Sequence, residues 1–365
     1  MSIKELDLIS FRNHKHLQLA FGKGINVIWG ENGSGKTAVL EAIHTFSIGR
    51  SFRTSRFRDL LKDGEEFFRV TGVFVHDNQE QIIQVNQTKD GRRRILVNGM
   101  PISGLKELIG KNPVVLLSPE EQDITKGNPS VRRAFFDRLF SVVSQPFLQV
   151  LSDYTRTLKQ RNAALCLVRD NRSNIKSVKA WEDILVDNGT KVWSQREHLF
   201  GQFTDHLRRT VIDYAEDGVE VTCIHEKTQH SNPDQFRKAL AANLQQDIHL
   251  GRTTVGPHRD NYKLVFQGKD LRLFGSQGEH KLTLVLLKLA EFRLIHKETG
   301  ILPILLLDDL FAKLDYQRSE NVLSLIEKDV QTVVTTTDLV PIEQHRIDLK
   351  QNGNKSIYLE RPCRV

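Results

Sequence analysis

The stretch that decides the fold of this chain is Gly30-Glu31-Asn32-Gly33-Ser34-Gly35-Lys36-Thr37, which matches the pattern GxxxxGK[ST]. Apolar segments at residues 24–29 and 36–46 flank it, which predicts a strand, a glycine-rich turn and a helix. Glycines let consecutive backbone N–H groups turn toward phosphate oxygens, and the helix N-terminus adds its dipole. We therefore expect Lys36 to bind the β- and γ-phosphates of a nucleotide and the Thr37 hydroxyl to bind Mg²⁺.

A second apolar run, at residues 301–307, ends in the two carboxylates Asp308 and Asp309. A strand that is buried on both faces shows such a continuous run, and ligands bind at the carboxyl ends of parallel strands. We expect Asp308 to hold magnesium, directly or through water, and Asp309 to orient the attacking water. The alternative is that the pair caps the following helix.

A third motif, Ser276-Gln277-Gly278-Glu279, opens a long apolar segment that predicts a helix over residues 277–297. Taken alone it is a capping box, in which Ser276 caps the helix and Glu279 reciprocates three residues later. Its place before the acidic strand also resembles the signature of ABC-type ATPases. This resemblance implies that the four residues contact the γ-phosphate of ATP bound to an opposite subunit, so that ATP joins two copies of the chain.

Two further segments occupy the places of other ABC-type elements. Residues 312–315, Ala-Lys-Leu-Asp, stand where that class has its D-loop. Residues 333–338 stand where many relatives have a switch histidine, but no histidine is present. Thr337 or Asp338 is therefore the candidate sensor of the γ-phosphate.

The composition suits a globular protein with an anionic partner. Of the 365 residues, 39% are apolar and 27% are charged, and the formal net charge is +7. This balance favours nucleic acid or an acidic membrane surface, or it serves solubility alone. The three cysteines form no CxxC pair, which argues against a common zinc module. Without an apolar signal region or a membrane-spanning run, we expect a cytoplasmic protein without a membrane partner.

The remaining chain divides by the period of its apolar residues. Residues 67–102 alternate with period two and carry the hairpin signal Asn98-Gly99, which predicts antiparallel strands of a second sheet. Asn-Pro pairs at 128–129 and 232–233 predict helix starts. Residues 181–214 form a long amphipathic segment whose apolar stripe, including Ile184 and Trp193, predicts a bundle core.

We therefore predict an α/β fold, an ABC-type P-loop ATPase head with an antiparallel β subdomain and an inserted short helical arm domain. The head is expected to comprise residues 1–112 and 250–365, and the arm residues 113–249.

The chain resembles the RecF family over residues 3–340, because five motifs occur in that family's order. They are Phe11-Arg12-Asn13-His14, residues 118–121 with 126–137, Val255-Gly256-Pro257-His258-Arg259-Asp260, residues 276–279 and residues 305–309. His14 stands where the family has Tyr, and Lys313 where it usually has Glu. Phe274-Gly275 stands where the family has Leu or Ala, and Glu279-His280 where it has Gln-Gln or Gln-Arg. These departures concern the rate of hydrolysis and communication between subunits rather than nucleotide binding.

The resemblance implies a protein that dimerises on ATP and binds single-stranded and gapped double-stranded DNA near junctions. It further implies cooperation with RecO and RecR in loading RecA, with roles in recombinational repair, replication restart and SOS induction. Hydrolysis of ATP, assisted by Mg²⁺, is expected to be slow, stimulated by DNA and used to regulate a clamp. Nucleotide contacts are implied for Arg12 and Asn13 as well as for Gly30, Glu31, Asn32, Gly33, Ser34 and Gly35.

Basic clusters are the candidates for DNA contacts, because phosphates are bound by Lys and Arg without reading the bases. The first candidates are Arg92, Arg93 and Arg94 in the predicted hairpin, and the second are Arg56 and Arg58. For each cluster, a solvated protein surface is the alternative.

Two other functions stay open. The chain could be the ATPase subunit of a membrane transporter, although those chains have a shorter helical insert and keep Ser-Gly-Gly-Gln more faithfully. It could also serve another ABC-type DNA-processing complex, although nuclease-associated relatives normally add a nuclease domain. The interval between residues 37 and 276 is too short for the coiled-coil arms of the long-armed chromosome-structure ATPases.

Overall fold

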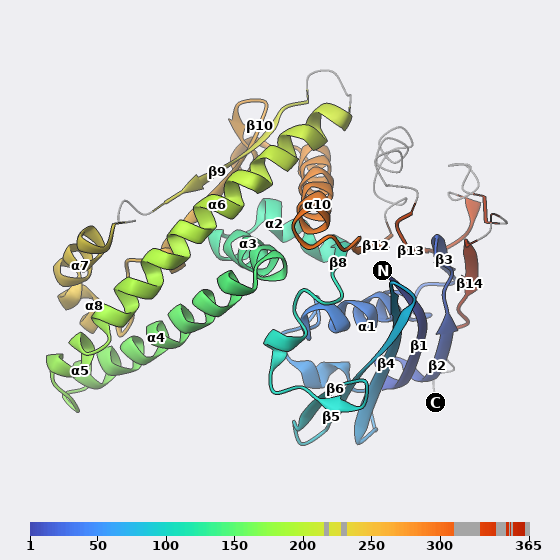
Figure 1. The fold of residues 1–365 in the computed structure, drawn as a ribbon, viewed down its shortest axis with the longest axis horizontal. Helices are drawn as coiled ribbons and strands as arrows, with labels where there is room; N and C mark the ends of the chain where they lie inside the picture. Colours follow the sequence, from blue (N-terminus) through green and yellow to red (C-terminus); the bar gives the residue numbers. More distant parts are fainter. Residues whose placement is uncertain are drawn as a thin grey trace. The chain divides into compact units, whose positions relative to one another are not determined.

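The computed structural model describes residues 1–214, 219–227, 232–309, 329–340, 348–349, 351 and 353–361 (Figure 1). The chain divides into two compact units. The head unit contains Met1–Gln122, Ile212–Glu216 and His280–Val365, and the arm unit contains Asp123–Val211 and Asp217–Glu279. The expected domain boundaries after residues 112 and 249 do not coincide with this division, because a small sheet at residues 221–270 belongs to the arm unit.

The head unit contains a six-stranded antiparallel sheet with the order β2-β1-β4-β5-β6-β7. Its strands are β1 (Ser2–Phe11), β2 (His14–Ala20), β4 (Phe67–His76), β5 (Gln79–Thr88), β6 (Arg93–Val97) and β7 (Met100–Pro101). The predicted turn joins β6 to β7, with φ of 51° at Asn98 and 79° at Gly99, as a hairpin turn with two left-handed residues requires. The predicted antiparallel strands are confirmed, and the unexpected β2 extends the sheet beyond β1.

A five-stranded parallel sheet carries the P-loop, with the order β14-β3-β13-β12-β8. Its strands are β3 (Ile25–Trp29), β8 (Val114–Leu117), β12 (Ile304–Asp308), β13 (Thr332–Thr336) and β14 (Lys355–Tyr358). Every residue of β8, β12 and β13 is buried, which explains the continuous apolar run before Asp308. Because the strands are parallel, the segments that follow β3, β8, β12 and β13 begin at one edge of the sheet.

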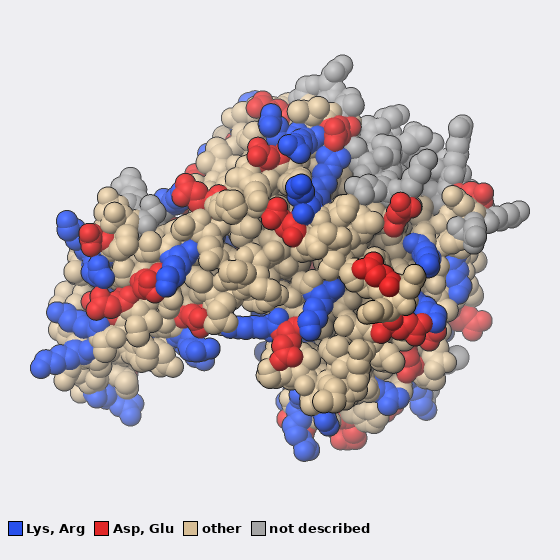
Figure 2. Space-filling view, viewed as in Figure 1, with Lys and Arg blue, Asp and Glu red and all other residues tan. Residues whose placement is uncertain are grey.

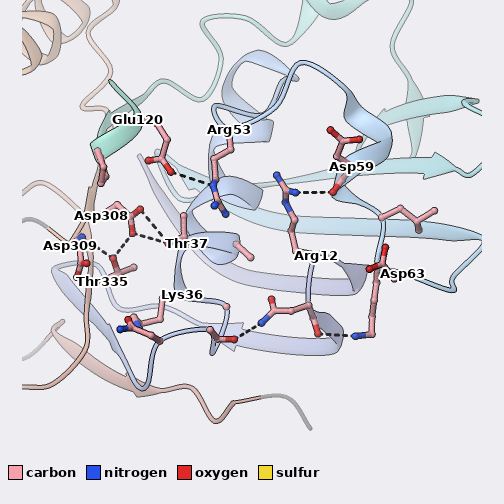
Figure 3. A pocket seen from close by; sticks show the side chains of 18 residues that line it. Arg12, Lys36, Thr37, Arg53, Asp59, Asp63, Glu120, Asp308, Asp309 and Thr335 are labelled. Carbon is pink, nitrogen blue, oxygen red and sulfur yellow. Dashed lines mark hydrogen bonds and ion pairs between the residues drawn. The ribbon is translucent and has the colours of Figure 1, made fainter. Parts of the chain in front are cut away.

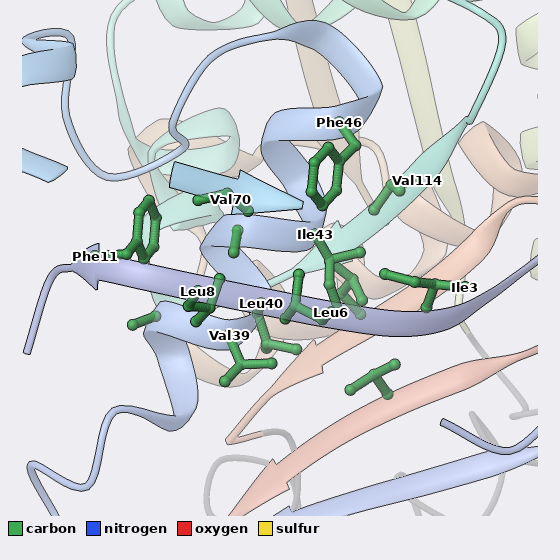
Figure 4. Packing of buried hydrophobic residues seen from close by; sticks show 14 of the residues in the cluster. Ile3, Leu6, Leu8, Phe11, Val39, Leu40, Ile43, Phe46, Val70 and Val114 are labelled. Carbon is green, nitrogen blue, oxygen red and sulfur yellow. The ribbon is translucent and has the colours of Figure 1, made fainter. Parts of the chain in front are cut away.

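Helix α1 (Lys36–Ile48) lies between the two sheets of the head unit and contacts strands of both. Figure 4 shows Val39, Leu40, Ile43 and Phe46 of this helix packed with Leu6 and Leu8 of β1. Gly72 of β4 makes room for the helix, since a Cβ there would lie 2.7 Å from the ring of Phe46. The helix that begins at the P-loop is therefore held on both of its sides.

The arm unit is mainly helical. Its longer helices are α3 (Pro129–Val143), α4 (Gln145–Arg169), α6 (Glu182–Tyr214, whose end lies in the head unit) and α7 (Pro233–Ala242). Shorter ones are α2 (Asp123–Lys126), α5 (Ile175–Lys179), α8 (Leu244–Leu250) and α9 (Leu271–Phe274). Both predicted Asn-Pro starts are confirmed, and the side chain of Asn232 accepts a hydrogen bond from the N–H of Asp234. Within the α6 stripe Trp193 is buried as predicted, whereas Ile184 is 49% exposed, so that part of the prediction is wrong.

The small sheet of the arm unit consists of β9 (Val221–Glu226), β10 (Asn261–Phe266) and β11 (Lys269–Asp270). It leads through α9 to helix α10 (Gln277–Thr299), which begins in the arm unit and continues in the head unit from His280 onward. Among the described residues, no helix combines the length and the apolar character that crossing a bilayer requires.

The segment of residues 255–260, the most distinctive of the family motifs, is held in the arm unit by buried hydrogen bonds. The carboxylate of Asp260 accepts hydrogen bonds from Trp193 Nε1 (2.9 Å), Arg196 Nη1 (3.2 Å) and His225 Nε2 (3.2 Å). His258 donates from Nε2 to the carbonyl of Thr253 (3.0 Å) and accepts at Nδ1 from the hydroxyl of Tyr154 (2.6 Å). These contacts join the segment before β10 to the helices α4 and α6 and to β9.

Candidate functional site

The loop of residues 30–37 connects β3 to α1 and depends on its glycines. The φ angles are 149° at Gly30, 87° at Gly33 and 96° at Gly35, in a region that side-chain-bearing residues rarely adopt. A Cβ on Gly30 would lie 2.3 Å from the carbonyl oxygen of Leu359, and one on Gly35 would lie 2.1 Å from Nε2 of His14. The backbone can therefore follow this path only with glycine at these positions.

The Phe-Arg-Asn-His motif braces the loop from the end of β1. Asn13 Nδ2 donates to the carbonyl of Gly33 (2.9 Å), and His14 Nε2 donates to the carbonyl of Gly35 (3.2 Å). Burial lowers the pKa of His14, which keeps the imidazole neutral with its proton on the nitrogen that faces Gly35. The structure thus places Asn13, a predicted nucleotide contact, directly on the loop.

Arg12 is held by a carboxylate that sequence reasoning missed. Its Nε and Nη2 atoms donate to the two oxygens of Glu41 (2.8 and 2.7 Å), and its Nη1 donates to the carbonyl of Asp59 (2.8 Å). Glu41 is fully buried on α1 and also accepts a hydrogen bond from Ser51. A charged residue inside an otherwise apolar helix was the available signal, since such a charge needs a partner.

The acidic strand meets the loop at Thr37. The Thr37 hydroxyl lies 3.2 Å from Oδ1 of Asp308, and the Thr335 hydroxyl donates to the same oxygen at 2.7 Å. Burial raises the pKa of Asp308, and the hydrogen bonds from Thr335 and Thr37 oppose that shift. Asp309 follows with a φ of 56°, and its N–H donates to the Thr335 hydroxyl (3.1 Å). An aspartate in this left-handed conformation is uncommon, and such residues concentrate at functional sites.

These groups line a pocket of about 750 Å³ in the head unit. Figure 3 shows Thr37, Asp308 and Thr335 turned toward one another, with Lys36 on the loop beside them. The Lys36 ammonium donates to the carbonyls of Gly30 (2.7 Å) and Glu31 (3.0 Å). Burial lowers the pKa of Lys36, whereas the charges of Asp309 and Asp308 raise it. Asn32, Gly33 and Gly35 also line the pocket.

The residues present fit a nucleoside triphosphate with a hard divalent cation. Ser34 is buried in the loop, and its hydroxyl has no hydrogen-bond partner among the described residues, so it is available to a phosphate oxygen. Thr37 and Asp308 offer a hydroxyl and a carboxylate oxygen at one place, and Mg²⁺ is usually bound by one or two such groups together with phosphates. The described residues contain no group of three or more His, Cys, Asp or Glu side chains arranged for another metal.

Several pocket residues were not foreseen from the sequence. Arg53 and Glu120 line the pocket from separate segments and form an ion pair with 3.4 Å between Nε and Oε1. Lys62 lines it as well and donates to the carbonyl of Asn13 (3.2 Å). Glu120 lies in the family motif at residues 118–121, but that Glu120, Arg53 and Lys62 line the same pocket depends on how distant segments pack.

Of the segment at residues 333–338 in which the γ-phosphate sensor was predicted, Thr335 and not Thr337 or Asp338 lines the pocket. Thr335 lines the pocket, whereas Thr337 is exposed and its hydroxyl donates to the carboxylate of Asp338 (3.3 Å). The segment expected to act as a D-loop, residues 312–315, lies outside the described residues.

The signature motif forms the predicted capping box at the start of α10. The N–H of Ser276 donates to Oε2 of Glu279 (2.6 Å), and the N–H of Glu279 donates to the Ser276 hydroxyl (3.3 Å). Ser276 and Gln277 are exposed, and Gly278 is half-buried. The motif therefore presents a serine hydroxyl and a helix N-terminus at the protein surface.

The two predicted basic clusters are neighbours in the head unit. The Arg93 guanidinium lies 3.8 Å from the ring centroid of Phe57, the residue between Arg56 and Arg58, and it donates to the carbonyl of Gly49. Burial and the charge of Arg50 lower the pKa of Arg93 to about 10. The Arg93 side chain is therefore packed against the protein. The side chains of Arg56, Arg58, Arg92 and Arg94 are exposed.

We call the four exposed arginines, Arg56, Arg58, Arg92 and Arg94, the basic surface. Arg92 pairs with Asp90 at 2.6 Å, and its side chain is 86% exposed. Figure 2 shows that positive and negative side chains are interspersed on the face it presents, so no single large basic field dominates that face.

Comparison with known proteins gives consistent matches. The family model of the RecF/RecN/SMC N-terminal domain matches residues 2–349. The DNA replication and repair protein RecF of Thermoanaerobacter sp. (strain X514) is 33% identical over 344 residues, which cover 92% of this chain and 94% of the relative. RecF of Bacillus thuringiensis (strain Al Hakam) is 33% identical over 360 residues, covering 95% of each chain.

Solved structures agree with these sequence matches. The recombination mediator protein RecF in complex with ATP, from the RecFOR pathway, superposes with a TM-score of 0.85 at 29% identity over 92% of each chain. The Smc head domain of Pyrococcus furiosus superposes with a TM-score of 0.53 at 18% identity and shares the fold. The predicted fold class, an ABC-type ATPase head with an antiparallel β subdomain and a helical arm, is confirmed.

Proposed function

Because the chain belongs to the RecF family of DNA replication and repair proteins, we propose that it is an ATPase that dimerises on ATP and binds gapped DNA. The observation that carries the proposal is the contact between Thr37 and Asp308, which joins the P-loop to the acidic strand inside the 750 Å³ pocket. A loop without such a carboxylate would bind phosphate but would lack a place for the metal that hydrolysis needs.

The loop residues hold the triphosphate in this proposal. The N–H groups of residues 31–35 surround its oxygens, and the ammonium of Lys36 turns from the carbonyls of Gly30 and Glu31 to the β- and γ-phosphates. Arg12, fixed by Glu41, and Asn13, fixed on Gly33, bound the pocket on the side of the antiparallel sheet. Because Asn13 and Arg12 are already held in place, little of their side-chain conformational entropy is lost when a nucleotide binds, and this favours binding.

Thr37 and Asp308 hold Mg²⁺, which supplies charge neutralisation of the phosphates when bound. Asp309, the next residue on the acidic strand, orients the attacking water and accepts its proton. The hydrogen bond from the N–H of Asp309 to Thr335 fixes the backbone of this aspartate in its left-handed conformation. Hydrolysis is slow because the site is complete only in a dimer.

The signature of a second copy completes the site. Ser276, Gln277, Gly278 and Glu279 approach the γ-phosphate with a hydroxyl and the N-terminus of α10, which favours negative charge. ATP then joins two chains, and hydrolysis separates them. Bound DNA stimulates ATP hydrolysis, hydrolysis opens the clamp, and the opened clamp releases the DNA.

DNA binds through the basic surface, whose arginines contact phosphates of single-stranded and gapped double-stranded DNA without reading sequence. One solved relative is described as a recombination mediator of the RecFOR pathway. By family membership we extend this to cooperation with RecO and RecR in loading RecA, in recombinational repair, replication restart and SOS induction.

Sedimentation velocity of the purified chain with and without ATP and gapped DNA tests the proposal. ATP is expected to convert monomer to dimer, and gapped DNA to strengthen the dimer and raise ATP turnover. A Ser276→Arg variant should bind ATP with unchanged affinity and remain monomeric, whereas Lys36→Ala should lose ATP binding. Wild-type protein that stays monomeric under all conditions would show a self-contained P-loop NTPase. A turnover that ignores DNA would favour the transporter class.

A further inference from the structure

Three charged side chains are buried together in the head unit, and the reaction described above uses none of them. Lys288 and Glu291 lie on α10, and Glu121 lies in the single 3₁₀ turn Pro119–Gln122 that follows β8. The Lys288 ammonium lies 2.6 Å from a carboxylate oxygen of Glu121 and 2.6 Å from one of Glu291. The three side chains, at most 7% exposed, form an ion-pair cluster in the protein interior.

Stability alone does not require such a cluster. Moving charges out of water costs free energy that their mutual attraction recovers only with good geometry, and apolar side chains of similar volume often give an equally stable protein. The cluster does restrict position, because each buried charge is tolerated only where its partner lies. Lys288 on α10 therefore fixes the place of Glu121 and of the turn that carries it.

The turn that is fixed in this way forms part of the nucleotide pocket. Glu120, next to Glu121, lines the pocket together with Asp308, and Figure 3 shows its carboxylate turned toward Arg53 (3.4 Å). β8 pairs with β12 in parallel, so the turn after β8 begins at the edge of the sheet where Asp308 lies. Glu121 is buried and does not line the pocket. A shift of Glu121 in the interior would therefore move the Glu120 carboxylate in the pocket.

We propose that Lys288 and Glu121 are positioning residues for ATP hydrolysis, which hold the Glu120 carboxylate in its place in the pocket wall. The inference rests on the proposed ATPase function and adds to it two residues that do not line the pocket. A misplacement of about 1 Å can slow a reaction on the order of 100-fold. The P-loop holds the triphosphate without this turn. Loss of the Lys288–Glu121 contact should therefore lower kcat while ATP binding persists.

Two matched variants of the full-length chain test the proposal. Glu121→Gln and Glu291→Gln each remove one carboxylate at the same distance from Lys288, but only Glu121 belongs to the pocket turn. We expect Glu121→Gln to lower kcat about 10- to 100-fold with an unchanged KM for ATP, measured as phosphate release with gapped DNA. Glu291→Gln should keep kcat near the wild-type value. Urea unfolding should show similar losses of stability in both variants.

A double-mutant cycle tests whether Glu121 acts through Glu120. Once Glu120→Gln has removed the carboxylate that is positioned, adding Glu121→Gln should lower kcat no further. Independent structural effects would instead multiply the two losses. If Glu121→Gln does not fold, Glu121→Asp keeps the charge and shortens the side chain by one methylene. It should also lower kcat, and adding the longer side chain of Lys288→Arg should restore part of the loss.

Each other outcome overturns the inference in a recognisable way. Equal kcat losses in Glu121→Gln and Glu291→Gln would show that the cluster is structural only. A raised KM with unchanged kcat would mean that the turn serves nucleotide binding, and multiplied losses in the cycle would exclude action through Glu120. Wild-type protein that does not hydrolyse ATP overturns the proposed function itself, which the wild-type measurement reveals before any variant is compared.

Discussion

At the scale of single residues, Asp308 combines a functional role with a cost in stability. Burial raises the pKa of its carboxyl group, so the native state holds that proton more tightly than the unfolded chain does. The contribution of Asp308 to stability therefore falls as the pH rises from the ordinary pKa of the carboxyl group, near 3.8, through its raised pKa in the folded state. The hydrogen bonds from Thr335 and Thr37 favour the charged form of the carboxyl group and so limit this cost.

Replacing Asp308 by asparagine should separate these two effects. We expect ATP hydrolysis to fall at least about 100-fold, because a metal ligand is lost. Without nucleotide at pH 7, the free energy of unfolding of the variant should be about 0.5–2 kcal/mol higher than that of the wild type. Phosphate release and urea unfolding measure the two quantities. Asp309→Asn is the control, which should lose hydrolysis without gaining stability. A less stable Asp308→Asn variant would contradict this account.

His258 should give the arm unit a pH-dependent stability. Burial lowers its pKa to about 4, helped by Arg259 and Arg133 and opposed by Asp260 and by the hydrogen bond to Thr253. Because the folded pKa lies below the unfolded value of 6.5, stability is complete above that value and declines as pH falls from 6.5 toward 4. Between pH 7.5 and pH 5 the loss should be about 2 kcal/mol.

The variant His258→Gln should lose this dependence while keeping a donor and an acceptor for Thr253 and Tyr154. Urea unfolding at pH 7.5 and pH 5, followed in wild type and variant, gives the difference. Equal losses in both proteins would show that other groups cause the acid sensitivity.

The site residues that could be predicted from the sequence lie in short motifs, whereas those that could not be predicted depend on partners far away in the chain. Lys36, Thr37 and Asp308 stand in patterns that a few neighbouring residues define. Glu41 and Thr335 matter because of partners that lie far away in the sequence, Arg12 and Asp308 respectively. Such pairings appear only when the sheets and α1 are assembled, so no single segment could reveal them.

At the scale of elements, a buried ion-pair cluster joins helix α10 to the segment that follows β8. The Lys288 ammonium lies 2.6 Å from Glu121 and 2.6 Å from Glu291, and the three side chains are nearly inaccessible to water. Glu120, next to Glu121, lines the nucleotide pocket. The cluster thus connects the pocket wall to the helix that begins with the signature motif.

Lys288→Met should destabilise the protein by about 3–5 kcal/mol, because it leaves two buried carboxylates without their cation. Thermal and urea unfolding without nucleotide measure the change. Lys297→Met, at an exposed position of the same helix, should have little effect. Adding Glu121→Gln to Lys288→Met should recover part of the loss. An unaltered Lys288→Met protein would mean that the cluster contributes no stability.

The sequence predicted individual helices and strands better than it predicted which strands pair with one another. The strand, loop and helix around residues 24–46, the hairpin at 98–99 and the helix at 182–214 were found, because each has its own periodicity or turn residues. β2 and the four-residue strand β8 were not expected. β1 pairs with β4, which lies more than fifty residues away in the sequence, and no local pattern in β1 specifies that partner.

At the scale of the whole molecule, the basic surface should determine how DNA affinity responds to salt. Arg56→Ser with Arg58→Ser should weaken binding to gapped DNA to a similar degree for unrelated sequences. The slope of log K against log salt should fall by about one for each phosphate contact removed. Titrations between low and moderate salt measure both effects.

Arg93→Ala provides the contrast, since its guanidinium packs on Phe57 and should affect stability more than the salt slope. Lys15→Ser, at an exposed position on β2, is a control for net charge. An unchanged salt slope in the Arg56/Arg58 variant would exclude the basic surface as the DNA contact.

The strand order of the parallel sheet has a consequence for how the protein is made. β3, which carries the P-loop, lies between β13 and β14, the last two described strands of the chain. A ribosome adding about 5–20 residues per second needs roughly 15–60 s to pass from residue 29 to residue 332. Throughout that interval neither of the two strands that flank β3 in the folded sheet has been made. The nascent chain therefore carries its ATP-binding loop on a strand without its sheet partners until residue 332 has been made, and a chain cut short before that residue cannot complete this sheet.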